Sequence, residues 1–176
     1  MANVPNIQNV TIGAATITWG GNTLGHTLGG AKLSFDRKFT ELEVDKYGKT
    51  PVELALNGQD LTIEMTLAEP IVDYIFNSIP EGTLLTGGVG KKLGFGVDAG
   101  ATLRQYAKQL ILHPNALPAL NVSQDIVIYQ AVSDTKLEMD YVVDKQRVFK
   151  VTFRALVDEN RGNGFRLGQM GQDPIS

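Results

Sequence analysis

The alternation of apolar and polar residues predicts that most of this chain folds as β-strands. Near the N-terminus, Val10, Ile12 and Ala14 alternate on one face, and Ile17 and Trp19 then alternate on the other. A switch of face after Ala14 is what a β-bulge produces, because one extra residue turns every following side chain over. These positions predict a bent N-terminal strand.

Two longer strands are predicted on either side of a charged segment. Residues 33–39 alternate apolar with polar side chains, and residues 52–67 form either a strand pair or one long bent strand. The dipeptide Asn57-Gly58 breaks the second pattern, and Asn-Gly is a strong hairpin signal. Between the two strands, residues 40–50 are expected to form a charged loop.

One short helix is predicted over residues 70–79. A proline occupies its first position, a second proline ends it, and isoleucines recur at four-residue spacing. A helix of this length needs a sheet to pack on. We expect Ile71, Ile75 and Phe76 to contact the sheet face formed by Leu61, Ile63 and Met65.

The C-terminal half is expected to add a long loop and further strands. Residues 82–100 contain seven glycines, which favour a flexible connection. Residues 102–112 fit a helical stripe or a strand, and we favour a strand in the second half of this segment. Three further strands are predicted at 125–132, 137–143 and 149–157; the first is apolar on both faces and is therefore expected to be central.

These elements add up to one domain, mainly β, built as an antiparallel sandwich or barrel with one short flanking helix and long loops. Residues 1–9 are expected to form an N-terminal arm, and residues 160–176 a polar, Gly-rich C-terminal tail. The length of 176 residues suits one such domain with a sizeable core.

Bulk composition excludes several classes of protein. The net charge of −3 gives no basic footprint for tight nucleic-acid binding. The chain has no cysteine, so disulfides and thiolate metal sites are excluded. It shows neither a secretory signal nor a run of about 18 apolar residues for a membrane helix. We therefore expect synthesis in a cytoplasm and no membrane insertion by this chain.

The uneven distribution of charge points to assembly. Residues 1–31 contain no Asp, Glu, Lys or Arg, whereas nine of the next 19 residues are charged. An uncharged polar segment is expected to pair its backbone with other strands, in this chain or in a neighbouring one. We expect contacts between subunits through this segment and through the charged loop. The candidate residues are Val10, Ile12, Ile17, Trp19, Glu41, Glu43, Asp45, Lys46 and Tyr47.

No catalytic or cofactor-binding constellation emerges. Gly90-Lys91 lacks the earlier glycine and the following Ser or Thr of a phosphate-binding loop. The two histidines, His26 and His113, stand apart without the spacing of a metal site. We expect a protein that is not an enzyme and that needs no cofactor.

The acidic residues of the charged loop have a second interpretation. Glu41, Glu43 and Asp45 share one face of an extended segment, which is an arrangement that can hold a cation. Since Lys46 and Lys49 lie nearby, a solvated acidic face is the favoured interpretation. We expect no metal site there.

Four sequence blocks resemble the major tail tube proteins of long-tailed bacteriophages. They are TLGGAKLS at 27–34, YGKTPV at 47–52 leading to LNG at 56–58, YQAV at 129–132 and RVFKVTFRALVD at 147–158. Their order and spacing, with the single helix after the second block, are similar to that family over nearly the whole chain.

The resemblance implies a β-sandwich protomer that forms six-membered rings stacked into a hollow tail tube. It implies contacts with other tail proteins, such as the tape measure and the tail terminator, and passage of DNA without sequence-specific binding. The protein would then reside in the virion tail, and in the host cytoplasm before assembly. Related folds form the tubes of contractile tails and of type VI secretion systems.

Two other classes compete with this interpretation. A monomeric β-sandwich module that binds carbohydrate or peptide is the first, although such modules present clustered surface aromatics and this chain has one Trp and 7% aromatic residues. An enzyme built on a β-barrel is the second.

Overall fold

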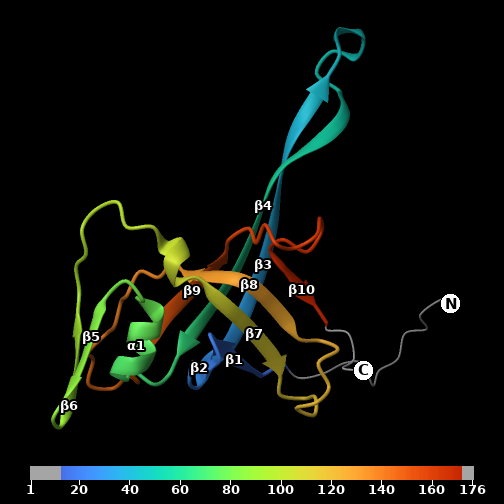
Figure 1. The fold of residues 1–176 in the computed structure, drawn as a ribbon. Helices are drawn as coiled ribbons and strands as arrows, with labels where there is room; N and C mark the ends of the chain where they lie inside the picture. Colours follow the sequence, from blue (N-terminus) through green and yellow to red (C-terminus); the bar gives the residue numbers. More distant parts are fainter. Residues whose placement is uncertain (1–12, 172–176) are drawn as a thin grey trace.

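The computed structural model describes residues 13–171, so Val10 and Ile12 lie outside the described part of the chain. The fold consists of a large antiparallel sheet, a separate two-stranded sheet and a short helix (Figure 1). In chain order the elements are β1 (Ala15–Trp19), β2 (Asn22–Thr23), β3 (Thr27–Glu43), the 3-10 turn η2 (Asp45–Tyr47), β4 (Pro51–Leu67), α1 (Val72–Ser78), β5 (Thr83–Gly87), β6 (Gly90–Gly94), the 3-10 turn η3 (Leu103–Tyr106), β7 (Lys108–Pro114), β8 (Ile126–Ser133), β9 (Phe149–Ala155) and β10 (Gly168–Met170).

The large sheet curls over so that distant strands face each other. Its order is β2-β1-β7-β8-β9-β4-β3, and β10 pairs with β8. Trp19 on β1 and Phe153 on β9 are separated by two strands in this order, yet their ring centroids are only 5.4 Å apart. The predicted mainly-β fold, an antiparallel sandwich or barrel with one short helix, is confirmed.

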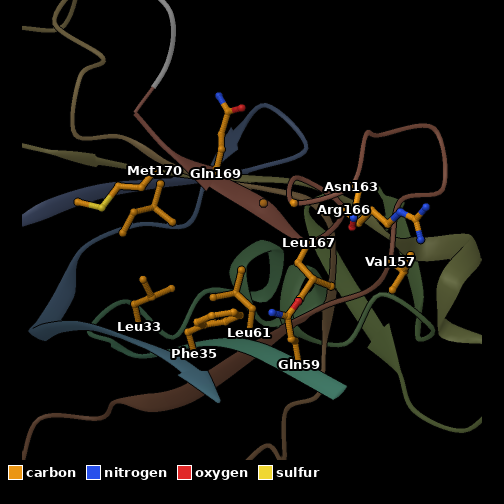
Figure 2. Close-up of a pocket in the computed structure, with 13 residues that line it drawn as sticks. Leu33, Phe35, Gln59, Leu61, Val157, Asn163, Arg166, Leu167, Gln169 and Met170 are labelled. Carbon is orange, nitrogen blue, oxygen red and sulfur yellow. The ribbon is translucent and has the colours of Figure 1, made fainter. Parts of the chain in front are cut away.

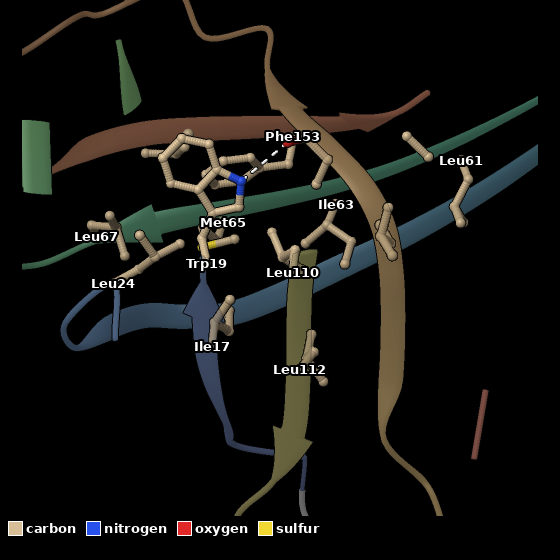
Figure 3. Close-up of a cluster of buried hydrophobic side chains, with 14 of the residues drawn as sticks. Ile17, Trp19, Leu24, Leu61, Ile63, Met65, Leu67, Leu110, Leu112 and Phe153 are labelled. Atoms are coloured by element: carbon tan, nitrogen blue, oxygen red, sulfur yellow. Dashed lines mark hydrogen bonds between the residues drawn. The ribbon is translucent and has the colours of Figure 1, made fainter. Parts of the chain in front are cut away.

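The hydrophobic core fills the space inside the curled sheet (Figure 3). The indole Nε1–H of Trp19 donates a hydrogen bond to the Ala131 carbonyl oxygen at 3.1 Å, so the polar atom of this buried ring is satisfied. Removal of apolar surface from water is the main driving force for this arrangement. The fully buried side chains include Ile17, Trp19, Leu24, Ile63, Leu67, Leu110, Ile128, Phe149 and Phe153.

The Asn57-Gly58 dipeptide does not form a hairpin. Both residues lie inside β4, which is one continuous strand of 17 residues. Lys38 pairs with Gly58 and Phe39 pairs with Leu56, which leaves Asn57 without a cross-strand partner. The dipeptide is therefore accommodated as a β-bulge, and the chain reverses instead at η2 and Gly48, whose φ is 63°.

The helix packs differently from the sequence prediction. Helix α1 has seven residues, and only Ile75 of the three predicted contacts is buried in the core. Ile71 is 47% exposed, so its predicted packing is wrong, and Phe76 is half-buried. Ile71 caps the N-terminus of the helix in an extended conformation, which removes it from the apolar stripe.

Three C-terminal segments also differ from the prediction. The Gly-rich loop 82–100 contains the hairpin β5–β6. Residues 137–143 form no strand and make one isolated bridge, from Met139 to Phe149 of β9. The tail contributes the short strand β10 beside β8. Within residues 13–171, no helix has the length and hydropathy to cross a membrane.

Candidate assembly surface

Strands β3 and β4 continue far beyond the body of the molecule as a two-stranded ribbon (Figure 1). We call residues 39–56 the hairpin arm. It begins at the register shift after Lys38 and contains the turn η2 at its tip. Every residue of the arm is exposed to solvent. The charged loop predicted over residues 40–50 is thus the outer part of a long β-hairpin.

The hairpin arm is unusually apolar for an exposed ribbon. Phe39 pairs with Leu56 and Glu41 pairs with Leu54, so the three apolar side chains share one face with a single carboxylate. An isolated two-stranded ribbon is marginally stable in water, and contiguous exposed apolar patches mark interaction sites. The exposed apolar residues of the arm, which are 44% to 55% exposed, are Phe39, Leu42, Val44, Tyr47, Val52, Leu54 and Leu56.

The structure brings together the charged residues that the sequence singled out. Glu41, Glu43, Asp45, Lys46 and Tyr47 all lie on the arm, and the Lys46 Nζ is 5.4 Å from the centroid of the Tyr47 ring. None of the three carboxylates takes part in an ion pair with another residue of the segment 13–171. In the same segment, no group of three or more His, Asp or Glu residues is placed to hold a metal ion.

Ile17 and Trp19 lie elsewhere, in the core of their own chain. Each is 1% exposed. Strand β1 pairs with β7 along one edge and with β2 at its end on the other. These side chains therefore contribute to the stability of the subunit, and any contact that β1 makes with a neighbour has to use its backbone or the side chains on its other face, such as Thr16.

The histidines hold loops in place at a distance from the arm. The Nδ1 of His113 and the Oδ1 of Asp125 are 2.7 Å apart and join the end of β7 to the start of β8. His26 is exposed, with its Nε2 3.6 Å from Glu69.

The exposed apolar residues of the arm were missed by the sequence analysis. Alternation assigned Phe39 to a half-buried strand, and Leu54 and Leu56 to a buried or paired one. The available signal was length, because strands of 17 residues are about three times longer than the usual strand of 5–6 residues. Strands that long extend beyond the body of a domain of this size.

No protein-family model and no functionally curated protein matches this sequence. A solved structure is similar in fold: the cryo-EM structure of the anti-feeding prophage cap, described as the AFP tube terminating cap. The TM-score is 0.52 at 10% sequence identity, and the match covers 87% of this chain and 91% of the cap protein. The chain therefore shares the fold of the tube terminating cap of the anti-feeding prophage.

Proposed function

We propose that this chain is a structural subunit of a phage-type tail, and that it assembles with copies of itself into a tail tube. The single observation that carries this proposal is the hairpin arm. Its apolar face has no partner in the described part of its own chain and lies outside the body (Figure 1). A second protein surface is the simplest cover for this face. A second copy of the same chain is present wherever the chain is made.

The asymmetry of the subunit supports stacking rather than a closed dimer. The arm lies at one end of the molecule, and the ribbon that extends in another direction, the hairpin β5–β6, has strands of five residues instead of 17 (Figure 1). A contact between an arm and a different surface is heterologous, and heterologous contacts close into rings or continue as open assemblies. Rings of six subunits and their stacking into a hollow tube are the arrangement we propose from the resemblance to tail tube proteins.

One polar face of the sheet suits a passage for DNA. On β4 and β9, the side chains opposite the core include Glu64, Lys150 and Arg154. Lys150 Nζ lies 3.5 Å from Glu64 Oε2, and Arg154 lies 3.5 Å from Asp60 and 3.4 Å from Asp134. Because each of these two cations has a carboxylate nearby, the face attracts phosphates weakly, as sliding of DNA requires. We propose this face for the lumen, and no catalytic role for the chain.

A tube-terminating cap is the second candidate, and the fold similarity to such a cap is the observation that favours it. A cap and a tube subunit are distinguished by where assembly stops. A tube protein continues to stack at high concentration, whereas a cap protein forms a single ring. Partners such as tape measure and tail terminator proteins, and a location in the virion tail, follow from either role.

Negative-stain electron microscopy of the concentrated full-length protein tests the proposal. We expect rings or tubes for the wild type. In a matched variant, residues 41–54 are replaced by Asn-Gly, which joins the paired residues Thr40 and Ala55 by a two-residue turn. This variant is expected to remain folded and to form no tubes. Dispersed monomers of the wild type at every salt concentration would contradict self-assembly.

A further inference from the structure

An apolar groove of about 520 Å³ lies at the base of the hairpin arm. On one side it is lined by the inner parts of β3 and β4, and on the other by β10 and the loop that precedes it (Figure 2). Leu33, Phe35 and Leu61 face Met170 across the groove (Figure 2). No pattern in the sequence indicates this groove, because β10 lies in the polar, Gly-rich tail.

At the groove, the core side of β3 is not covered by another element of the described chain. Leu33 pairs with Ile63 and Phe35 pairs with Leu61, so these side chains point to the same side of the sheet as the core. Ile63 is fully buried, yet Leu33 is 39% and Phe35 is 50% exposed. The sheet therefore continues past the described elements that cover it, and it leaves an apolar surface on which another apolar segment can pack.

The charges of the arm complement those of the groove. Arg166 is the only charged residue among those of the described chain that line the groove, and no carboxylate in residues 13–171 forms an ion pair with it. The arm carries four carboxylates and two lysines. One of these carboxylates, Glu41, lies on the apolar face opposite Leu54.

We propose that this groove is the socket for the hairpin arm of a second copy of the chain. Leu54 and Leu56 of the arm fill the space between Leu33, Phe35 and Met170, and Glu41 pairs with Arg166. The arm cannot fill the groove of its own subunit, because β3 and β4 run straight from the groove into the arm (Figure 1). The inference rests on the proposed self-assembly, and it names the surface that receives the arm.

The geometry gives the assembly a direction. The socket lies near the middle of β3 and β4, at residues 33–35 and 59–61, whereas the arm extends outward from residues 39 and 56. Each bound copy is therefore displaced along the arm relative to the previous one. A contact of this type does not close on itself within a dimer, and repetition produces a stack. It also covers the exposed apolar surface of both the arm and the groove in one step.

Disulfide trapping tests the contact directly, because the chain has no cysteine of its own. Two single variants, Leu54→Cys and Met170→Cys, are mixed under assembly conditions and oxidised, and the cross-linked peptides are identified by mass spectrometry. We expect a disulfide between positions 54 and 170 of different chains. The matched control replaces Met170→Cys by Val143→Cys, which is 99% exposed and lies outside the groove. Equal cross-linking to both positions would overturn the proposal.

Charge reversal gives a second, independent readout. Arg166→Glu is expected to raise the protein concentration for half-assembly about three- to tenfold, because an attraction becomes a repulsion. Adding Glu41→Arg on the arm is expected to restore assembly. Failure of this rescue, with both variants folded, would contradict the pairing of these residues.

The remaining outcomes separate this inference from the proposed function. Tubes or rings that form without the 54–170 cross-link would overturn the socket and leave self-assembly standing. Absence of any assembly of the wild type would overturn both. The double variant Val10→Cys with Met170→Cys tests the chain's own N-terminal segment as the occupant. If this variant forms a disulfide within one chain, and the 54–170 cross-link between chains does not form, the groove belongs to that segment and the proposal is overturned.

Discussion

The two halves of β4 have the same alternating pattern and opposite surroundings. In the inner half, Leu61, Ile63, Met65 and Leu67 are at most 9% exposed. In the outer half, residues 51–57 are all exposed, including Leu54 at 55%. The inner half faces β1 and β7 across the core, whereas no described element of the chain covers the outer half (Figures 1 and 3). Alternation thus indicates that a face is to be buried, but not which chain buries it.

The energetic consequence differs between the two halves. Complete burial of a leucine side chain contributes about 1.5–3 kcal/mol. For the inner half this free energy stabilises the subunit itself. For the outer half it becomes available only on association, where it offsets the loss of translational and rotational freedom. Substitutions in the two halves should therefore affect different measurements, namely unfolding for the inner half and assembly for the outer half.

The largest effect on unfolding is expected for Phe153→Ala. Phe153 is fully buried and packs against Trp19, so the change creates a cavity and should lower the free energy of unfolding by about 3–5 kcal/mol. Denaturant unfolding monitored by the fluorescence of Trp19, the one tryptophan, measures it. Lys150→Ala on the exposed face of the same strand is the control, with a loss of at most about 1 kcal/mol. Equal losses would contradict the assignment of the core.

A smaller effect is expected for Trp19→Phe. The change removes the N–H that donates to the Ala131 carbonyl oxygen, and a buried acceptor without its donor costs about 1–3 kcal/mol. Assembly of the folded fraction should be unchanged, because Trp19 is 1% exposed. The comparison would fail if sedimentation velocity showed weaker assembly while the free energy of unfolding stayed at the wild-type value, since Trp19 would then act at an interface.

Helix α1 provides a third comparison, between neighbouring isoleucines. Ile75→Val is expected to lower the free energy of unfolding by about 0.5–1.5 kcal/mol, because Ile75 reaches the core. Ile71→Val should change it by less than about 0.5 kcal/mol, because Ile71 is 47% exposed. Thermal unfolding of both variants measures the difference. If Ile71→Val lowered the free energy of unfolding more than Ile75→Val, Ile71 would pack in the core, as the sequence predicted.

Local chemistry explains which parts of the fold the sequence could predict. The strand at 149–157 was predicted well because its alternation is uninterrupted and both of its edges are paired. The turn at Gly20-Gly21 has an equally local cause, since both glycines adopt the positive φ angles, 58° and 82°, that a tight two-residue hairpin turn requires. In both cases the signal resides in a few consecutive residues.

The remaining features depend on contacts between distant segments. Asn57-Gly58 has the local preference for a turn, but pairing with β3 on both sides of it imposes a bulge. Residues 137–143 alternate like a strand, but they make one isolated bridge to β9, from Met139 to Phe149, and no continuous pairing. The residues of the candidate assembly surface show the same difference. Glu41 and Lys46 could be predicted from their charge. Leu54 and Leu56 could not, because their alternating pattern is that of a core strand.

The smallest effect on unfolding, with a large effect on assembly, is expected for Leu54→Asp on the hairpin arm. Leu54 is 55% exposed and contacts no core residue, so the free energy of unfolding should change by at most about 0.5 kcal/mol. Leu85→Asp on β5 is the matched control, because Leu85 is 58% exposed and lies outside the arm and the groove. We expect electron microscopy to show rings or tubes for the control and none for Leu54→Asp, because a carboxylate on the apolar face must be desolvated when the arm is covered. If both variants assembled like the wild type, the outer half of β4 would be an ordinary exposed ribbon, and its exposed apolar residues would have no role in assembly.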